Sequence, residues 1–316
     1  MQGKRPMPVQ PAGLIAAPPT PMHEDGSLAA ETIPRQAEFL RHNGLSGAFV
    51  CGSTGESLSL TVDERSTVAQ TWLHHRQPGL AVIVHVGHES VCDARRLAQH
   101  AAGAGADAIA AMAPCFFTPE LEELVAFCAA IAEAAPETPF YYYHIPSRTG
   151  LDAHIPAFLE AASPHIPTLA GVKFTHENLA AFGDAVALQN ERFNLLFGRD
   201  EMLLAGLALG ARGAVGTTYN FAAPLYLSLM DAFARGDLDT ARTRQTQART
   251  MIAAVRKYGG LAAFKKVMAL VGLDCGPCRL PLRPFENSRT EALREELETI
   301  GFFDYCCRPE PGDTER

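Results

Sequence analysis

Residues 106–143, ADAIAAMAPCFFTPELEELVAFCAAIAEAAPETPFYYY, contain the pattern that decides the fold. Two short apolar runs, at residues 106–112 and 140–143, have the length of buried strands. Between them, apolar side chains recur at the spacing of one helix face: Leu121, Leu124, Val125, Cys128, Ile131 and Ala132. A strand, a helix and a strand in this order predict two parallel strands joined by a crossover helix.

The same unit recurs along most of the chain. The apolar runs are residues 14–17, 47–50, 81–86, 106–112, 140–143, 170–174, 193–197 and 213–216, and they start roughly 20 to 35 residues apart. About eight strand–helix units favour an α/β fold of the closed (β/α)₈ type, a TIM barrel. An open doubly wound sheet is the structural alternative.

The chain becomes mostly helical after residue 221, through residues 251–271, and residues 276–284 form a proline-rich irregular stretch. We therefore expect four parts: a tail at residues 1–11, the barrel at 12–220, a helical C-terminal extension packed on the barrel at 221–300, and a second tail at 301–316.

Composition and charge exclude several classes of protein. A content of 47% apolar and 20% charged residues is typical of a globular domain, and a chain of 316 residues needs no disulfide or metal to stabilise its core. The net charge is −8 without any block of Lys or Arg, so we expect no nucleic-acid partner. No apolar run is long enough to predict a membrane span.

The cellular location is expected to be the cytoplasm. Lys4 and Arg5 are not followed by the apolar segment of a secretory signal. The eight cysteines are scattered, as in proteins with reduced thiols. Cys275 and Cys278 have the spacing of a redox pair, but they follow a predicted helix instead of opening one, so redox activity is not favoured.

Lys173 is the first candidate for catalysis, because it interrupts the apolar run LAGVKF at residues 169–174. Burial disfavours the charged form of an amine and lowers its pKa. A neutral amine can attack a ketone and form a Schiff base. The alternative is a lysine at a strand end that is paired with a carboxylate.

Three other strand ends carry polar groups, and in a barrel the carboxyl ends of the strands carry catalysis. Tyr143 can act as an acid or base, although a packing aromatic is the alternative. The GSTGE loop at residues 52–56 offers backbone N–H groups and two hydroxyls to a carboxylate, or is a plain turn. Asp200 and Glu201 can accept hydrogen bonds from sugar hydroxyls, or Asp200 caps a helix. The histidines show no metal-binding spacing.

Several of these runs together resemble the dihydrodipicolinate synthase/N-acetylneuraminate lyase family, over roughly residues 12 to 300, and most of all its lyase branch. The matching runs are GSTGE at 52–56, FYYYHIP at 140–146, GVKFT at 171–175, FGRDE at 197–201 and GAVGTTYN at 213–220.

The resemblance implies a class I (Schiff-base) aldolase that cleaves N-acetylneuraminate to N-acetylmannosamine and pyruvate. It implies that Lys173 forms the Schiff base, that Tyr143 moves the proton, and that Ser53 and Thr54 hold the carboxylate of the 2-keto acid. The residues implied to contact the polyol are Thr175, Gly198, Asp200, Glu201 and Thr217. The family is commonly homotetrameric and needs no metal or organic cofactor.

Some positions complicate the choice of branch. Arg148, in the run PSRTG at residues 146–150, resembles the synthase branch, where an arginine binds the carboxylate of an aldehyde substrate. Phe116 and Phe117 stand where some relatives place a tyrosine from a neighbouring subunit, and they offer no hydroxyl. The alternatives are therefore a synthase-like condensation of pyruvate with an aldehyde acid, another 2-keto acid aldolase, and a catalytically silent homologue that acts in binding or assembly.

Overall fold

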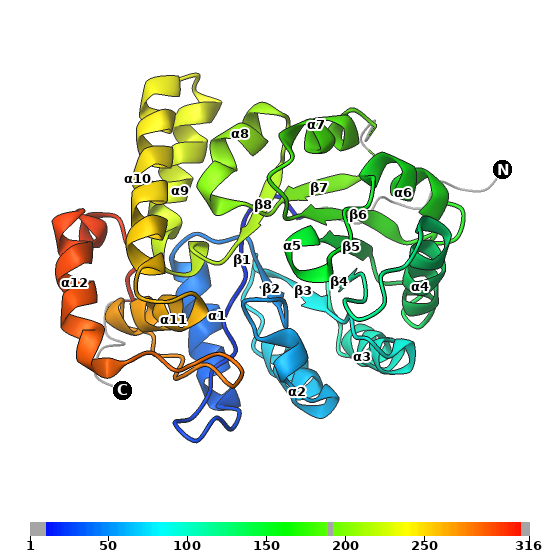
Figure 1. Ribbon diagram of the computed structural model, residues 1–316, viewed down its shortest axis with the longest axis horizontal. Coiled ribbons are helices and arrows are strands. Elements are labelled where there is room, and N and C mark those ends of the chain that lie inside the picture. Colours follow the sequence, from blue (N-terminus) through cyan, green and yellow to red (C-terminus); the bar gives the residue numbers. More distant parts are fainter. Residues whose placement is uncertain (1–10, 189–191, 311–316) are drawn as a thin grey trace.

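The computed structural model describes residues 11–188 and 192–310, and it is a closed barrel of eight parallel strands in chain order (Figure 1). The predicted (β/α)₈ barrel with extra C-terminal helices is confirmed. The strands are β1 (Gly13–Ala16), β2 (Gly47–Val50), β3 (Ala81–His85), β4 (Ala108–Met112), β5 (Phe140–His144), β6 (Leu169–Phe174), β7 (Asn194–Phe197) and β8 (Gly213–Gly216). The barrel closes where β1 pairs with β8.

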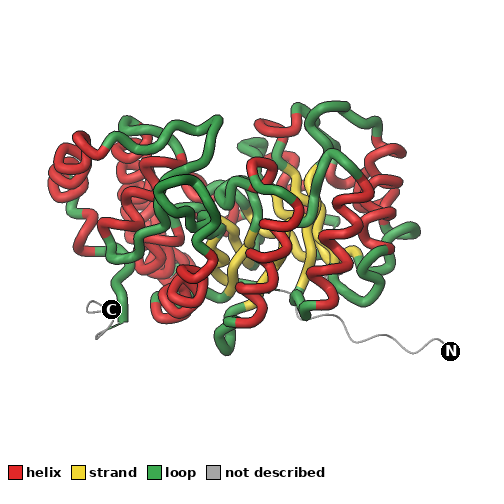
Figure 2. The backbone as a smooth tube through the Cα atoms, turned by 90° about the horizontal axis from the view of Figure 1, so that it is seen from below, coloured by secondary structure: helices red, strands yellow, loops and turns green. Residues whose placement is uncertain are grey.

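Each strand is followed by a helix that covers the outside of the barrel (Figure 2). These helices are α1 (Ile33–His42), α2 (Val62–His74), α3 (Val91–Gly103), α4 (Leu121–Glu133), α6 (Ile155–Ala162), α7 (Leu179–Ala187), α8 (Leu203–Ala208) and α9 (Tyr219–Ala234). A single helical turn, α5 (Pro146–Thr149), lies between β5 and α6. The helix predicted from apolar spacing after β4 is α4, and its apolar positions Leu124, Cys128 and Ile131 are fully buried.

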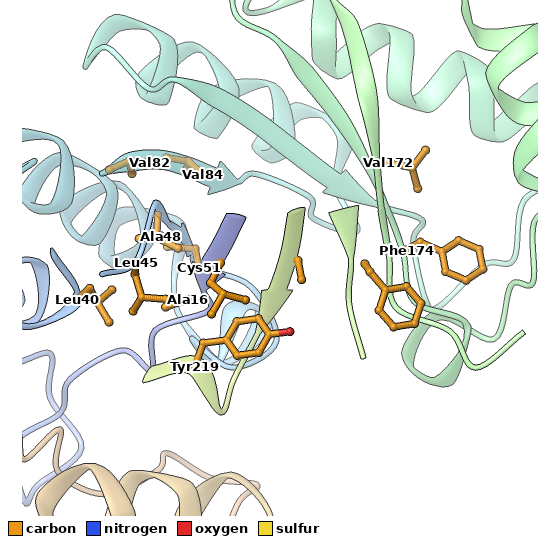
Figure 3. Close-up of a cluster of buried hydrophobic side chains, with 14 of the residues drawn as sticks. Ala16, Leu40, Leu45, Ala48, Cys51, Val82, Val84, Val172, Phe174 and Tyr219 are labelled. Atoms are coloured by element: carbon orange, nitrogen blue, oxygen red, sulfur yellow. The ribbon is translucent and has the colours of Figure 1, made fainter. Parts of the chain in front are cut away.

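Alternation along the strands divides the apolar core into two layers. The larger layer lies between the strands and the helices, and Figure 3 shows part of it, with Val82 and Val172 from strands and Leu40 from a helix. The smaller layer fills the barrel and includes Phe49 and Tyr143. Residues on the same strand therefore face either the helices or the barrel interior.

The helical extension consists of α10 (Leu238–Arg256), α11 (Leu261–Leu270) and α12 (Thr290–Thr299). The helical run expected at 251–271 is interrupted at residues 257–260, where Gly259 has a φ of +124° that a helix does not accommodate. The eighth barrel helix, α9, begins before the predicted boundary at residue 220 and ends beyond it. The division into barrel and extension stays a prediction.

The predicted tails have different outcomes. Residues 1–10 and 311–316 lie outside the described residues. Residues 302–307 pack on the molecule: Phe302 is fully buried, and the backbone N–H of Cys307 donates to the carbonyl of Phe221 at 2.8 Å. Within the chain that is described, no helix combines the length and apolar character needed to cross a membrane.

Cys275 and Cys278 are both buried free thiols in an irregular segment. Burial raises the pKa of each of these thiols to about 12. Because the thiolate is the reactive form, the pair lacks the depressed pKa of a redox motif.

Candidate active site

Lys173 and Tyr143 are neighbours across the pairing of β5 with β6, and both side chains point into the barrel. The Lys173 Nζ lies 3.9 Å from the centroid of the Tyr143 ring and 3.9 Å from that of Phe49, on β2. Since Val172 and Phe174 face the helices, alternation places Lys173 on the opposite, inner face. The amine is thus held between two aromatic rings near the carboxyl ends of the strands.

The environment of Lys173 lowers its pKa. The residue is only 4% exposed, and burial disfavours the ammonium form. The neighbouring side chains of Tyr143 and Asp200 oppose part of this lowering of the Lys173 pKa. In the described part of the chain, no carboxylate lies within ion-pair distance of the Nζ, so the alternative of a strand-end ion pair is not supported. The amine is therefore closer to its nucleophilic form than an exposed lysine is.

The GSTGE loop lies between β2 and α2 and brings its two hydroxyls to this end of the barrel. The Ser53 Oγ lies 3.3 Å from the Tyr143 Oη. The Thr54 Oγ1 lies 2.7 Å from the Thr217 Oγ1, which follows β8. Four of the predicted site residues, from three different strand ends, are therefore joined by hydroxyl contacts.

Asp200 follows β7 and is almost completely buried. Its Oδ2 accepts hydrogen bonds from the backbone N–H of Thr218 at 2.8 Å and from the Thr218 Oγ1 at 2.7 Å. Among the described residues, no hydrogen bond joins its side chain to the 3₁₀ turn that it opens, Asp200–Met202, as the capping alternative would require; the side chain instead ties this turn to Thr218, the residue that precedes α9. Burial raises the pKa of this carboxyl to about 6.

Glu201 lies between two arginines. Its Oε1 is 3.1 Å from the Arg199 guanidinium and 3.3 Å from that of Arg256, on α10. The side chain is 20% exposed, so this carboxylate is oriented and still reachable by a ligand.

Thr175 and Gly198 are in contact at the ends of β6 and β7. The Thr175 Oγ1 is buried and makes no hydrogen bond to a described residue. A Cβ on Gly198 would lie 2.0 Å from that oxygen, so only glycine fits there. A buried hydroxyl without a partner is costly, and a ligand that hydrogen-bonds to it would recover this cost.

The residues that complicate the choice of branch are exposed. Arg148 lies on the α5 turn, is exposed, and makes no ion pair with any residue that the structure describes. Phe116 and Phe117, after β4, are 78% and 77% exposed and pack against each other with ring centroids 4.8 Å apart.

The sequence analysis missed two residues that shape the site. Phe49 contacts the amine and packs edge-on against Tyr143, with ring centroids 5.3 Å apart. His85, at the end of β3, packs edge-on against the same tyrosine at 5.7 Å. Burial and the nearby Arg65 lower the pKa of His85 well below its usual value, so its ring is neutral at pH 7. Alternation along β2 could have identified Phe49 as an inward residue.

No cluster of three or more His, Cys, Asp or Glu side chains that could hold a metal ion occurs among residues 11–188 and 192–310. The chemistry available to the site is that of an amine, a phenol, several hydroxyls and two carboxylates. Together they can bind an anionic carbonyl compound and hold a polyhydroxylated group beside it.

The sequence model of the dihydrodipicolinate synthetase family matches residues 10–300. The chain belongs to this family. Among its relatives is the N-acetylneuraminate lyase of Mus musculus, 41% identical over 296 residues that make up 92% of each chain. The family resemblance drawn from the five sequence runs is confirmed.

Solved structures within the family agree with the fold. The Proteus mirabilis N-acetylneuraminate lyase has a TM-score of 0.90 and 38% identity, covering 93% of this chain and 99% of that one. The Ruminococcus gnavus sialic acid aldolase catalytic lysine mutant has a TM-score of 0.88 and 27% identity, covering 93% and 97%. The chain is therefore similar to lyases of this family over nearly its whole described length.

Proposed function

We propose that this protein is a class I aldolase, a carbon–carbon lyase that cleaves N-acetylneuraminate to N-acetylmannosamine and pyruvate. The observation that carries the proposal is the buried Lys173 amine, 3.9 Å from the Tyr143 ring centroid, beside the hydroxyls of the GSTGE loop. The similarity to N-acetylneuraminate lyases over 92% of the chain supports the same substrate.

Each residue has a role in the proposed reaction. The neutral amine of Lys173 attacks the keto carbon and water leaves, which gives an iminium. The iminium withdraws electrons from the C3–C4 bond, while Tyr143 takes the proton of the C4 hydroxyl as that bond breaks. The products of this step are N-acetylmannosamine and an enamine on Lys173. Protonation of the enamine carbon and hydrolysis of the iminium release pyruvate and the free lysine.

The surrounding residues bind the two halves of the substrate in this proposal. Ser53 and Thr54 hold the carboxylate next to the keto carbon. The polyol is contacted by Thr175, Gly198, Asp200, Glu201 and Thr217. The partner of the protein is thus a small 2-keto acid. The proposal also includes a homotetramer that needs no metal or organic cofactor, as the family resemblance implies, and a cytoplasmic location, as the N-terminal segment and the scattered cysteines predict.

A panel of substrates tests this function. The purified protein is incubated with N-acetylneuraminate, and pyruvate release is measured; in parallel it is given pyruvate with aspartate semialdehyde, and condensation is measured. We expect pyruvate release from N-acetylneuraminate and little condensation. The reverse pattern would assign the protein to the synthase-like alternative, and inactivity with every 2-keto acid would favour a silent homologue.

Glu201→Ala is expected to weaken the use of N-acetylneuraminate without weakening pyruvate binding. The loss of a hydrogen bond from a sugar hydroxyl to a charged group costs about 1–3 kcal/mol, or roughly a 5- to 150-fold fall in kcat/KM. Pyruvate lacks the polyol, so the pyruvate concentration that half-saturates borohydride trapping should be the same in Glu201→Ala as in the wild type. The measurement is kcat/KM for cleavage beside the pyruvate concentration that half-saturates trapping.

Glu177→Ala is the matched control, because Glu177 also faces Arg199, at 3.8 Å, but is 63% exposed. It should change neither quantity. An equal loss of cleavage and of pyruvate trapping in Glu201→Ala would show that Glu201 supports the fold of the site and does not contact the sugar.

Arg148 separates the lyase from the synthase-like candidate, because its exposed guanidinium can form a bidentate pair with a substrate carboxylate. If the protein is a lyase, Arg148→Leu should leave cleavage of N-acetylneuraminate within about threefold of wild type, as expected for an exposed side chain. Both activities are measured in both proteins. Strong wild-type condensation that vanishes in the variant, with no cleavage in either, would overturn the lyase proposal.

A further inference from the structure

The GSTGE loop is bounded by two residues with an unusual backbone. Cys51 and Glu56 have φ values of +57° and +58°, and they are the non-glycine residues with positive φ in the described chain. This left-handed conformation is unfavourable for a residue with a Cβ and persists where the surrounding structure holds it. The loop that carries Ser53 and Thr54 is therefore held in a shape that it would not adopt alone.

At its C-terminal end the loop is held by a buried ion pair. The Glu56 Oε1 accepts a hydrogen bond from the Lys265 Nζ at 2.8 Å, and its Oε2 accepts one from the backbone N–H of Arg279 at 2.7 Å. The side chains of Glu56 and Lys265 are 0% and 2% exposed, and Lys265 also donates to the Pro277 carbonyl at 2.6 Å. Such a pair is stable only when its hydrogen bonds are satisfied.

Both anchoring groups come from outside the barrel. Lys265 lies on α11, and Arg279 follows it in the irregular segment of the C-terminal extension (Figure 1). Lys265, Thr54 and Thr217 surround the same closely packed gap, which is too small to hold a water molecule. The C-terminal extension thus packs against the hydrogen-bonded pair of Thr54 and Thr217.

The rest of the loop is held by hydrogen bonds from the barrel side. The His85 Nδ1 lies 3.1 Å from the Cys51 carbonyl. The Thr20 Oγ1 donates to the Gly55 carbonyl at 2.7 Å. The Glu56 carboxylate is the point where the extension holds the loop through charge.

We infer that the Glu56–Lys265 pair positions the GSTGE loop to bind the carboxylate of the 2-keto acid, which makes Lys265 a positioning residue in the C-terminal extension. This inference rests on the proposed function, in which Ser53 and Thr54 hold that carboxylate. Without the pair, Glu56 can leave its left-handed conformation, and the loop hydroxyls lose their fixed direction. The carboxylate contact exists in both ground and transition states, so its loss raises KM and leaves kcat nearly unchanged.

The test compares pyruvate with methyl pyruvate, whose carboxylate is esterified, in reductive trapping by borohydride. Lys265→Met keeps the length of the side chain and removes its charge, and Lys266→Met, on the next and more exposed residue, is the matched control. The pyruvate concentration for half-maximal trapping should rise about tenfold in Lys265→Met, the order expected for weakening a hydrogen bond to a charged group. With methyl pyruvate it should change less than about twofold, and Lys266→Met should match wild type with both.

Lys265→Met leaves the buried charge of Glu56 unpaired and can therefore fail to fold. The double variant Glu56→Gln/Lys265→Met is tested as well. This double variant leaves no buried charge, and the amide oxygen of Gln can still accept from the Arg279 N–H. Circular dichroism and the melting temperature establish that each protein is folded. A folded variant whose trapping is unchanged for pyruvate, or shifted equally for both compounds, overturns the inference. A wild-type protein that traps neither compound instead overturns the proposed function.

Discussion

Replacement of Lys173 by arginine is expected to abolish the cleavage of N-acetylneuraminate. Arginine stays protonated and cannot attack a ketone, so no iminium forms. The rate should fall by a factor of about 10⁴ or more, the range found when a covalent nucleophile is removed. The guanidinium can keep the contact with the rings of Phe49 and Tyr143, both of which lie 3.9 Å from the lysine nitrogen.

Pyruvate release by purified Lys173→Arg measures this effect, and circular dichroism with thermal melting checks that the barrel is intact. Lys266→Arg serves as a control for lysine replacement, because Lys266 lies on α11 in the C-terminal extension and not on a barrel strand. This variant should keep full activity. A folded Lys173→Arg protein that still cleaves at more than a small fraction of the wild-type rate would contradict the role of this amine.

Tyr143→Phe is expected to lower kcat by about 10² to 10⁴, the usual range for loss of an acid–base group. The ring that packs on Lys173 and Phe49 is retained, and only the hydroxyl next to the Ser53 Oγ is lost. Because the amine is unchanged, the pyruvate adduct should still form and be trapped. The measurement is kcat for cleavage together with the yield of trapped adduct.

Tyr141→Phe is the matched control for this prediction. Tyr141 also points into the barrel, two residues before Tyr143 on β5. Its hydroxyl accepts a hydrogen bond at 3.2 Å from the Nδ2 of Asn194, the first residue of β7, and so lies toward the amino ends of the strands, away from the site. Its removal should leave kcat nearly unchanged. An unaffected kcat in Tyr143→Phe would show that the proton moves by another route.

The fold was largely predictable from sequence because its signals are local. Apolar runs of four to seven residues separated by helical periodicity predicted β2 and β8 with the bounds that the structure has, and the other strands to within two residues. Both the barrel and the place of Lys173 and Tyr143 at strand ends follow from this periodicity. The end of α10 was missed because the predicted helical run did not take the Gly259–Gly260 pair into account.

The contacts of the site were less predictable because their partners are distant in sequence. Thr54 and Thr217 are 163 residues apart, and Glu56 and Lys265 are 209 apart. Asp200 was expected to contact a sugar hydroxyl or to cap its own turn. Its hydrogen bond with Thr218 forms because β7 and β8 are paired, so that the residues following the two strands lie side by side. Periodicity places such residues on a face, but only the closed barrel brings their atoms together.

The most direct test of a Schiff-base mechanism is to locate the covalent bond. The wild-type protein is incubated with pyruvate, reduced with borohydride, digested, and analysed by mass spectrometry. We predict a single reduced pyruvyl adduct on the peptide that contains Lys173, at about one per chain as one amine per site requires. An adduct at another lysine, or no adduct at a saturating pyruvate concentration, would contradict the account.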